Sequence, residues 1–144
     1  MYKGLLHAHS YIAYLALILL IVASINAIIG MTSKKEFKDG DRKLSLLALI
    51  FTHTQLLVGL ILYFNSPNVR IFDSPMGEIM KDSTLRLYAI EHPLINIIAV
   101  ILITIGFSKH KKAATSHAKF KSIAIMFALG TILILSRIPW NNWL

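Results

Sequence analysis

Cysteine is absent from this 144-residue chain, which carries six histidines. Disulfides, thiolate-bound iron–sulfur clusters and covalently attached c-type heme all need cysteine, so the composition excludes them. The sequence also lacks a phosphate-binding loop and a nucleophile–base set, so no pattern in it indicates a stand-alone enzyme. Any metal or metallocofactor that the chain binds must therefore be held by histidine.

Acidic residues are few: seven Asp and Glu against fifteen Lys and Arg give a net charge of +8. This excess does not indicate nucleic-acid binding, because ten of the basic residues lie in two short segments, five in 31–43 and five in 108–121. Basic segments between apolar stretches are typical of the cytoplasmic side of membrane proteins. Their expected partners are the anionic headgroups of a lipid bilayer.

Hydrophobic residues make up 56% of the chain and gather in four long stretches. About 20 consecutive apolar residues suffice to cross a bilayer. The predicted spans are residues 11–30, 44–64, 85–107 and 122–138. Four spans with short connections predict an all-α membrane protein, a single antiparallel up-down four-transmembrane-helix bundle over residues 1–144.

The orientation of this bundle follows from its charges. The first span is longer than the apolar core of a signal peptide, about 7–15 residues, so we expect it to be retained. The two basic segments belong inside, and the connection 65–82, which has few basic residues, belongs outside. Both termini are therefore expected on the outer side of the membrane.

The third span opens with side chains that a lipid-facing helix would not carry, Glu91 and His92 followed by Pro93. An ionisable residue inside a membrane span indicates a functional site. Pro93 has no N–H to offer the carbonyl of Ala89. In a membrane such a carbonyl is tolerated only where protein or water satisfies it, so we expect this turn to face the protein interior.

His92 shares one helix face with Tyr88 and Asn96, which stand four residues before and after it. Glu91 lies about 100° around the helix from that face. We expect Glu91 to pair with Arg137, because Arg86 precedes it by five residues in the same helix and is awkwardly placed. The alternative is that Arg137 only extends to the membrane interface.

The second span carries His53 among leucines, so this imidazole needs a partner from another helix. The depth of each residue can be counted at 1.5 Å per residue from the expected outer helix ends, Phe64 and Ser83. His53 then lies roughly 16 Å and His92 roughly 14 Å from the outer side. Two histidines at one depth on antiparallel helices suit a heme b that is ligated on both faces. The predicted ligand pair is His53 with His92, and the rival pair is His9 with His92.

Four further residues complete the candidate site. Arg86 and Arg137 end their helices on the outer side, where the anionic heme propionates would lie. His7 and His9 are expected near the outer surface, above the site. His110 and His117 lie among lysines on the opposite side, where we expect solvent or lipid headgroups.

Two other functions are consistent with the same residues. A non-heme copper or zinc site could be built from His7, His9, Glu91 and His92, since imidazole and carboxylate suit these metals. Alternatively, the chain is a structural subunit of a membrane complex. In that case Glu91, Gln55 or Asn96 hydrogen-bond His53 and His92 without any cofactor.

Several segments resemble small four-span bacterial membrane proteins labelled cytochrome b or cytochrome b561-like. The resemblance covers nearly the whole chain and implies heme b, electron transfer between a quinol and a redox partner, and a place in the bacterial cytoplasmic (inner) membrane. It also allows a homo-oligomer or a complex subunit. The segments that carry it are Leu6-His7-Ala8-His9-Ser10, the run from Thr52-His53 to Tyr63, Gly40-Asp41-Arg42-Lys43, Met80-Lys81-Asp82-Ser83, Glu91-His92-Pro93 and Ile138-Pro139-Trp140.

Overall fold

Helices make up almost all of residues 2–65 and 76–140, the part of the chain described in the computed structural model of the protein. Four helices are long: α1 (Tyr2–Thr32), α2 (Asp39–Asn65), α5 (His92–Lys112) and α6 (Ser116–Ser136). Three short elements, α3 (Met76–Lys81), α4 (Ser83–Arg86) and the π-helical turn η1 (Leu87–Glu91), lead into α5. These described ranges contain no strand, so the all-α prediction is confirmed.

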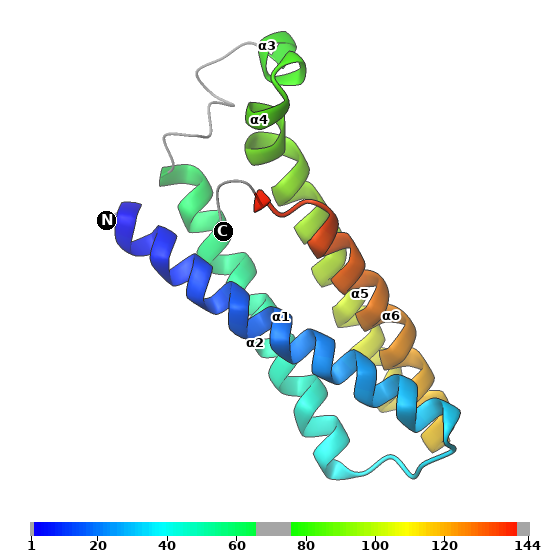
Figure 1. The fold of residues 1–144 in the computed structure, drawn as a ribbon. Coiled ribbons are helices and arrows are strands. Elements are labelled where there is room, and N and C mark those ends of the chain that lie inside the picture. The colour runs from blue at the N-terminus through cyan, green and yellow to red at the C-terminus, as the bar shows by residue number, and fades with distance from the viewer. Residues whose placement is uncertain (1, 66–75, 141–144) are drawn as a thin grey trace.

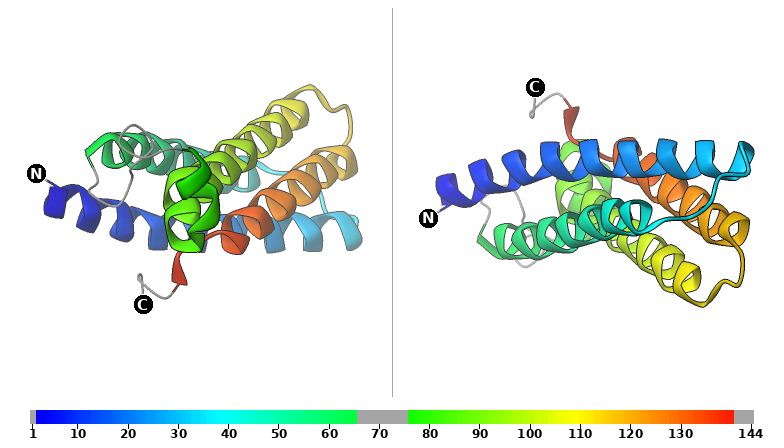
Figure 2. Two further views of the ribbon diagram at one scale, coloured as in Figure 1. Left: turned by 90° about the horizontal axis from the view of Figure 1, so that it is seen from above. Right: turned by 90° about the horizontal axis from the view of Figure 1, so that it is seen from below.

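Four helical segments are long and apolar enough to cross a membrane, as the hydropathy predicted. Consecutive long helices run in opposite directions and form two hairpins, α1 with α2 and α5 with α6 (Figure 1). The hairpins meet because α1 also packs on α6, and α2 on α5, as the views from above and below show (Figure 2). The segments are Lys3–Thr32, Asp39–Asn65, Ser83–Lys112 and Ser116–Ser136.

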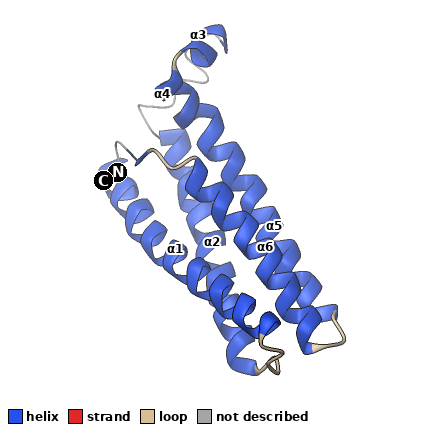
Figure 3. Ribbon diagram, turned by 45° about the vertical axis from the view of Figure 1, so that its right-hand side comes forward, coloured by secondary structure: helices blue, strands red, loops and turns tan. Residues whose placement is uncertain are grey.

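The two ends of the bundle differ in their connections. At one end, here called the loop end, lie the short connections 33–38 and 113–115. The start of α1, the α3–α4 segment and the end of α6 lie at the other end (Figure 3). We call it the cavity end, after the cavity described below. Of the predicted connection 65–82, residues 66–75 fall outside the described ranges. Asp82 caps α4 as a helix start should, since its carboxylate accepts from the N–H groups of Thr84 and Leu85 at 3.0 and 3.1 Å.

The helices extend beyond the predicted spans. α1 begins at Tyr2 rather than residue 11, and α2 begins at Asp39 rather than residue 44. Hydropathy marks where a helix is apolar, whereas a helix continues until a cap or a breaker ends it. As a consequence, His7 and His9 are helical residues of α1, although they precede the predicted span.

The apolar core occupies the half of the bundle nearer the loop end. Phe120, Ile123 and Phe127 of α6 pack there against Ile103 and Phe107 of α5. The packed face of α1 carries a stripe of mostly small residues at helical spacing, which lets neighbouring helices approach closely. Its members are all buried: Ala16, Leu20, Ala23, Ala27 and Gly30.

His110 does not lie in solvent or among headgroups, so this prediction was wrong. Only 1% of its surface is exposed, and its ring lies between those of Phe37 and Phe107, with ring-centre distances of 5.3 and 4.5 Å. Its Nδ1 bonds the backbone oxygen of Phe107. The flanking lysines misled the prediction, because residues next to one another in a helix face different directions. His117 is exposed, as expected.

A buried carboxylate ties the 33–38 connection to the bundle. The side chain of Asp41 is 8% exposed, and its oxygens accept from the amide of Asn26 and the backbone N–H of Lys38, both at 2.9 Å. The ammonium of Lys35 lies 3.8 Å away. The bond to Lys38 is one half of a capping box that starts α2. The bond to Asn26 joins α2 to α1.

We expect Asp41→Asn to destabilise the protein by about 1–3 kcal/mol. The new side-chain NH₂ group would face the Asn26 amide or the Lys38 N–H, and because both of these are donors, one hydrogen bond would be lost. The measurement is thermal unfolding in detergent, followed by circular dichroism. Asp39→Asn is the matched control, since Asp39 is 68% exposed and pairs with Arg42 and Lys43 on the helix surface. Exposed pairs contribute about 0–1 kcal/mol. Equal losses in the two variants would contradict the assigned role of Asp41.

Candidate functional site

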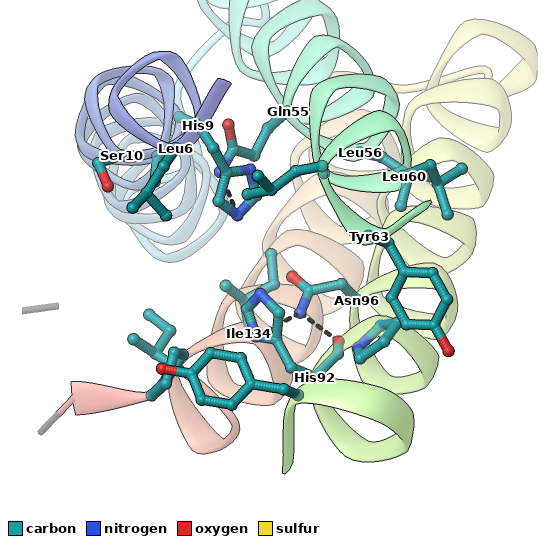
Figure 4. A pocket seen from close by; sticks show the side chains of 18 of the residues that line it. Leu6, His9, Ser10, Gln55, Leu56, Leu60, Tyr63, His92, Asn96 and Ile134 are labelled. Carbon is teal, nitrogen blue, oxygen red and sulfur yellow. Dashed lines mark hydrogen bonds between the residues drawn. The ribbon is translucent and has the colours of Figure 1, made fainter. Parts of the chain in front are cut away.

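A large cavity lies between the two hairpins in the half of the bundle nearer the cavity end. Its volume is about 940 Å³, within the range of about 300–1,000 Å³ that ligand and cofactor sites occupy. All four long helices and the α4–η1 segment line it, mostly with apolar side chains. The polar groups that reach it include His9 from α1, Gln55 from α2, and His92 and Asn96 from α5 (Figure 4).

His9 reaches the cavity because α1 already begins at Tyr2 and because Gly59 of α2 leaves room for the imidazole ring. A Cβ atom at Gly59 would lie 3.0 Å from Cε1 and 3.5 Å from Nδ1 of His9. The Nε2 of His9 lies 3.4 Å from the amide nitrogen of Gln55, which makes a long hydrogen bond. The Nδ1 of His9 and the Oε1 of Gln55 are buried and have no partner within the described ranges. Buried polar atoms without partners are uncommon and call for an explanation.

The ring of His92 is held by a backbone carbonyl of another helix. Its Nδ1 lies 2.8 Å from the backbone oxygen of Arg137, at the end of α6. A carbonyl oxygen only accepts, so Nδ1 must carry the proton, and Nε2 of the neutral ring is left with a free lone pair. Asn96 donates to the backbone oxygen of His92 at 2.5 Å. Its 3.2 Å approach to Nδ1 therefore joins two donors and adds little.

The two imidazoles come from opposite hairpins and face each other across the cavity (Figure 4). Their ring centres are 6.2 Å apart, and their planes are nearly perpendicular at 85°. A metal ion binds a histidine nitrogen at about 2.0–2.1 Å, which places two trans imidazole centres on the order of 6 Å apart. The rings of His9 and His92 thus have the separation at which one ion fits between them.

The structure does not bring His53 next to His92, so the predicted juxtaposition of these two residues was wrong. The Nε2 of His53 lies 2.8 Å from the hydroxyl of Thr104 on α5. Its partner does come from another helix, as expected, but the residue is exposed on the bundle surface and does not line the cavity. The histidine that the structure places opposite His92 is His9, from the rival pair.

The depth estimate failed because it assumed that Ser83 lies at the same depth as the end of α2, and it does not. The hydroxyl of Tyr63 reaches the backbone oxygen of Ala89 at 2.8 Å, so the end of α2 lies beside Ala89. From that level His53 is ten residues away, about 15 Å, whereas His92 is three residues away, about 4.5 Å. The α4 segment before Ala89 extends beyond the end of α2, and counting from Ser83 placed His92 too deep.

Glu91 pairs with both arginines that were considered for it. Its carboxylate lies 3.1 Å from Nε of Arg86 and 3.9 Å from Nε of Arg137. The nearer partner is the one judged awkward from sequence, where residues five apart in an α-helix differ by about 140° in direction. The π-helical turn Leu87–Glu91 removes that obstacle, because its i→i+5 hydrogen bonds bring residues five apart toward one face. None of these three residues lines the cavity.

The remaining candidates lie near the cavity without completing a metal site. Tyr88 lines it, as does His7, which is otherwise exposed. Within residues 2–65 and 76–140, no three His, Asp or Glu side chains are close enough to hold a metal ion together. The set that was considered for copper or zinc, His7, His9, Glu91 and His92, is therefore not assembled in this structure.

Four residues contribute to the site in ways that the sequence did not indicate. Gln55 was expected to hydrogen-bond His53 or His92, and Gly59 had no assigned role, but both contact His9. On α2 these two residues form a stripe at helical spacing with Ala48 and Thr52. Arg137 supplies its backbone carbonyl to His92, and Tyr63 supplies its hydroxyl to Ala89. A polar residue within a small-residue stripe was the available signal for Gln55. No sequence pattern identifies the Arg137 carbonyl as the acceptor for His92.

A scan against protein-family models, a search of curated proteins and a search of solved structures each found no match.

Proposed function

We propose that the chain binds one heme b between His9 and His92 and serves in membrane electron transfer, accepting electrons from a quinol and passing them to a redox partner. The observation that carries the proposal is the pair of imidazoles 6.2 Å apart across a cavity of about 940 Å³. Bound heme supplies one-electron chemistry, with a potential set by its axial ligands and surroundings.

The donor set fits this cofactor. His92 presents an unprotonated Nε2 because the Arg137 carbonyl fixes its protonated Nδ1, the kind of support that orients ligating histidines. Ligation at Nε2 of His9 requires the Gln55 amide to turn aside. That movement gives up one long hydrogen bond, and the Gln55 Oε1 has no partner to lose within the described ranges.

The apolar lining suits the macrocycle, since the side chains of Leu17, Leu20, Leu56 and Val100 exclude water from it. Arg86 and Arg137 point to Glu91 rather than into the cavity, so we assign them to holding the segment that carries His92. Binding of heme propionates by either arginine would require it to leave that carboxylate. This assignment differs from the role that the sequence suggested for them.

The electron-transfer proposal is tested on protein purified after heme supplementation, mixed without oxygen with a water-soluble quinol. Growth of the bands of reduced heme, reaching most of the amplitude that dithionite produces, is the expected result. Reduction by dithionite but not by quinol would overturn the choice of donor. A preparation in which neither reagent produces these bands would overturn the function itself.

We further place both termini on the outer side of a bacterial inner membrane, from the basic residues at the loop end. The chain has no cysteine, so single-cysteine variants can be read without background. Cysteines at Gly40 and Ala114, both exposed near the loop end, should resist an impermeant thiol reagent in spheroplasts. A cysteine at Gly77 in α3 should react. The reverse labelling pattern would refute this orientation.

A further inference from the structure

The helix that carries His92 is interrupted immediately before it. Pro93 has no N–H, so the carbonyl of Ala89, its partner in a regular α-helix, is left without its usual i→i+4 hydrogen bond. Ala89 is 3% exposed, and a buried unpaired carbonyl is costly. The hydroxyl of Tyr63 on α2 donates to this oxygen at 2.8 Å. A side chain from a different hairpin thus completes the backbone of the third membrane span.

The same turn is widened. The backbone N–H of His92 bonds the oxygen of Leu87, five residues earlier, which is the π-helical pattern. This widening brings Arg86 and Glu91 to 3.1 Å. His92 is the first residue after the widened turn, so the direction of its ring depends on whether the turn is kept.

Tyr63 also connects the supports of the two histidines. It lies one turn beyond Gly59 on α2, and Gly59 is in contact with the ring of His9. The bond to Ala89 therefore joins the helix that packs on His9 to the segment that presents His92. This one hydrogen bond joins the two hairpins about one helical turn from the facing imidazoles.

We infer that Tyr63 is a positioning residue: by bonding the Ala89 carbonyl it keeps the π-helical turn and so sets the orientation of His92. The part that concerns heme rests on the proposed function. The part that concerns the turn does not, because the Arg86–Glu91 ion pair forms only while the π-helical turn is kept, and its strength can be measured in protein without heme.

The test in heme-free protein is a double-mutant cycle between Tyr63→Phe and Arg86→Gln, read as the apparent Tm in detergent. Without the hydroxyl the turn relaxes, Arg86 and Glu91 move apart, and the Tm loss caused by Arg86→Gln should fall to half or less of its value in the parent. The control background is Tyr11→Phe, which removes a hydroxyl from a residue 69% exposed, and there the loss should be unchanged. Equal Arg86→Gln losses in all backgrounds would overturn the inference.

A rescue variant separates this role from general destabilisation. Pro93→Ala restores an N–H that can bond Ala89, so the Tyr63 hydroxyl becomes redundant. The Tm loss caused by Tyr63→Phe should then be at least halved in the Pro93→Ala background. If Tyr63→Phe alone fails to fold, recovery of folded protein in the double variant is the expected result, and failure of both would refute the inference.

The spectroscopic readout concerns His92 itself. In heme-loaded protein, Tyr63→Phe should convert part of the low-spin six-coordinate spectrum to a high-spin form. Thr54→Val, which removes a hydroxyl from an exposed residue of α2 outside the cavity, should not. Suppose that the spectrum is unchanged in Tyr63→Phe, while the heme-free cycle shows coupling between Tyr63 and Arg86. This result would refute the effect of Tyr63 on heme ligation and support its role in keeping the π-helical turn. Wild-type protein that binds no heme would refute the proposed function, and the cycle would still decide the role of Tyr63.

Discussion

His9→Ala and His92→Ala are each expected to abolish the six-coordinate low-spin heme spectrum, whereas His53→Ala should retain it. Both imidazoles border the cavity and lie 6.2 Å apart, while His53 bonds Thr104 on the bundle surface. Losing a partner that only orients a metal ligand costs about 10–100-fold in affinity, and losing the ligand itself should cost more. The measurement is heme content per folded protein together with the ferric and ferrous absorption spectra.

The control for folding is circular dichroism and elution as a single species in detergent, which all three variants must show. His53→Ala loses one hydrogen bond, so a modest fall in stability is expected there without a change in the spectrum. Loss of the low-spin spectrum in His53→Ala, with His9→Ala unaffected, would contradict the pairing that the structure supports. It would return the site to the pair predicted from sequence.

Filling the space beside His9 should also weaken heme binding while leaving both ligands in place. In Gly59→Leu the new Cβ would start 3.0 Å from Cε1 of His9, and the branches beyond it would push the ring aside. Overpacking of this kind costs about 1–3 kcal/mol, equivalent to about 5–150-fold weaker binding. Heme titration of the heme-free protein measures the change.

The matched control is Gly40→Leu, in the same helix, where an added Cβ meets nothing within 4 Å. It should leave heme affinity unchanged. Gly59→Ala should give an intermediate effect, because only a small displacement of the imidazole is needed. Equal affinity in Gly59→Leu and Gly40→Leu would show that the cofactor does not use His9.

The number of helices and their alternating directions were predictable because membrane helices satisfy their own backbone and must be apolar over a fixed length. The packing face of α1 also follows from local sequence, because Ala16, Ala23, Ala27 and Gly30 repeat at helical spacing and small residues let membrane helices approach closely. These properties depend on local composition and period. They do not require knowledge of how the hairpins are offset along the bundle axis.

The pairing of histidines depends on that offset, which the sequence alone does not fix. His92 and His53 were matched by counting from Ser83, and the true level of α2 is set by the contact between Tyr63 and Ala89. The π-helical turn adds one residue to a turn and allows Arg86 to reach Glu91. Pro93 indicated that the Ala89 carbonyl would be satisfied by protein, and it is, but no residue pattern identified Tyr63 as the donor.

The visible absorption spectrum of the wild-type protein, purified after heme supplementation, tests the central claim most directly. One low-spin six-coordinate heme b per chain is the predicted result, with sharp reduced bands that disappear in His9→Ala and in His92→Ala. A protein that folds into its helical bundle and carries no heme under these conditions would contradict the claim.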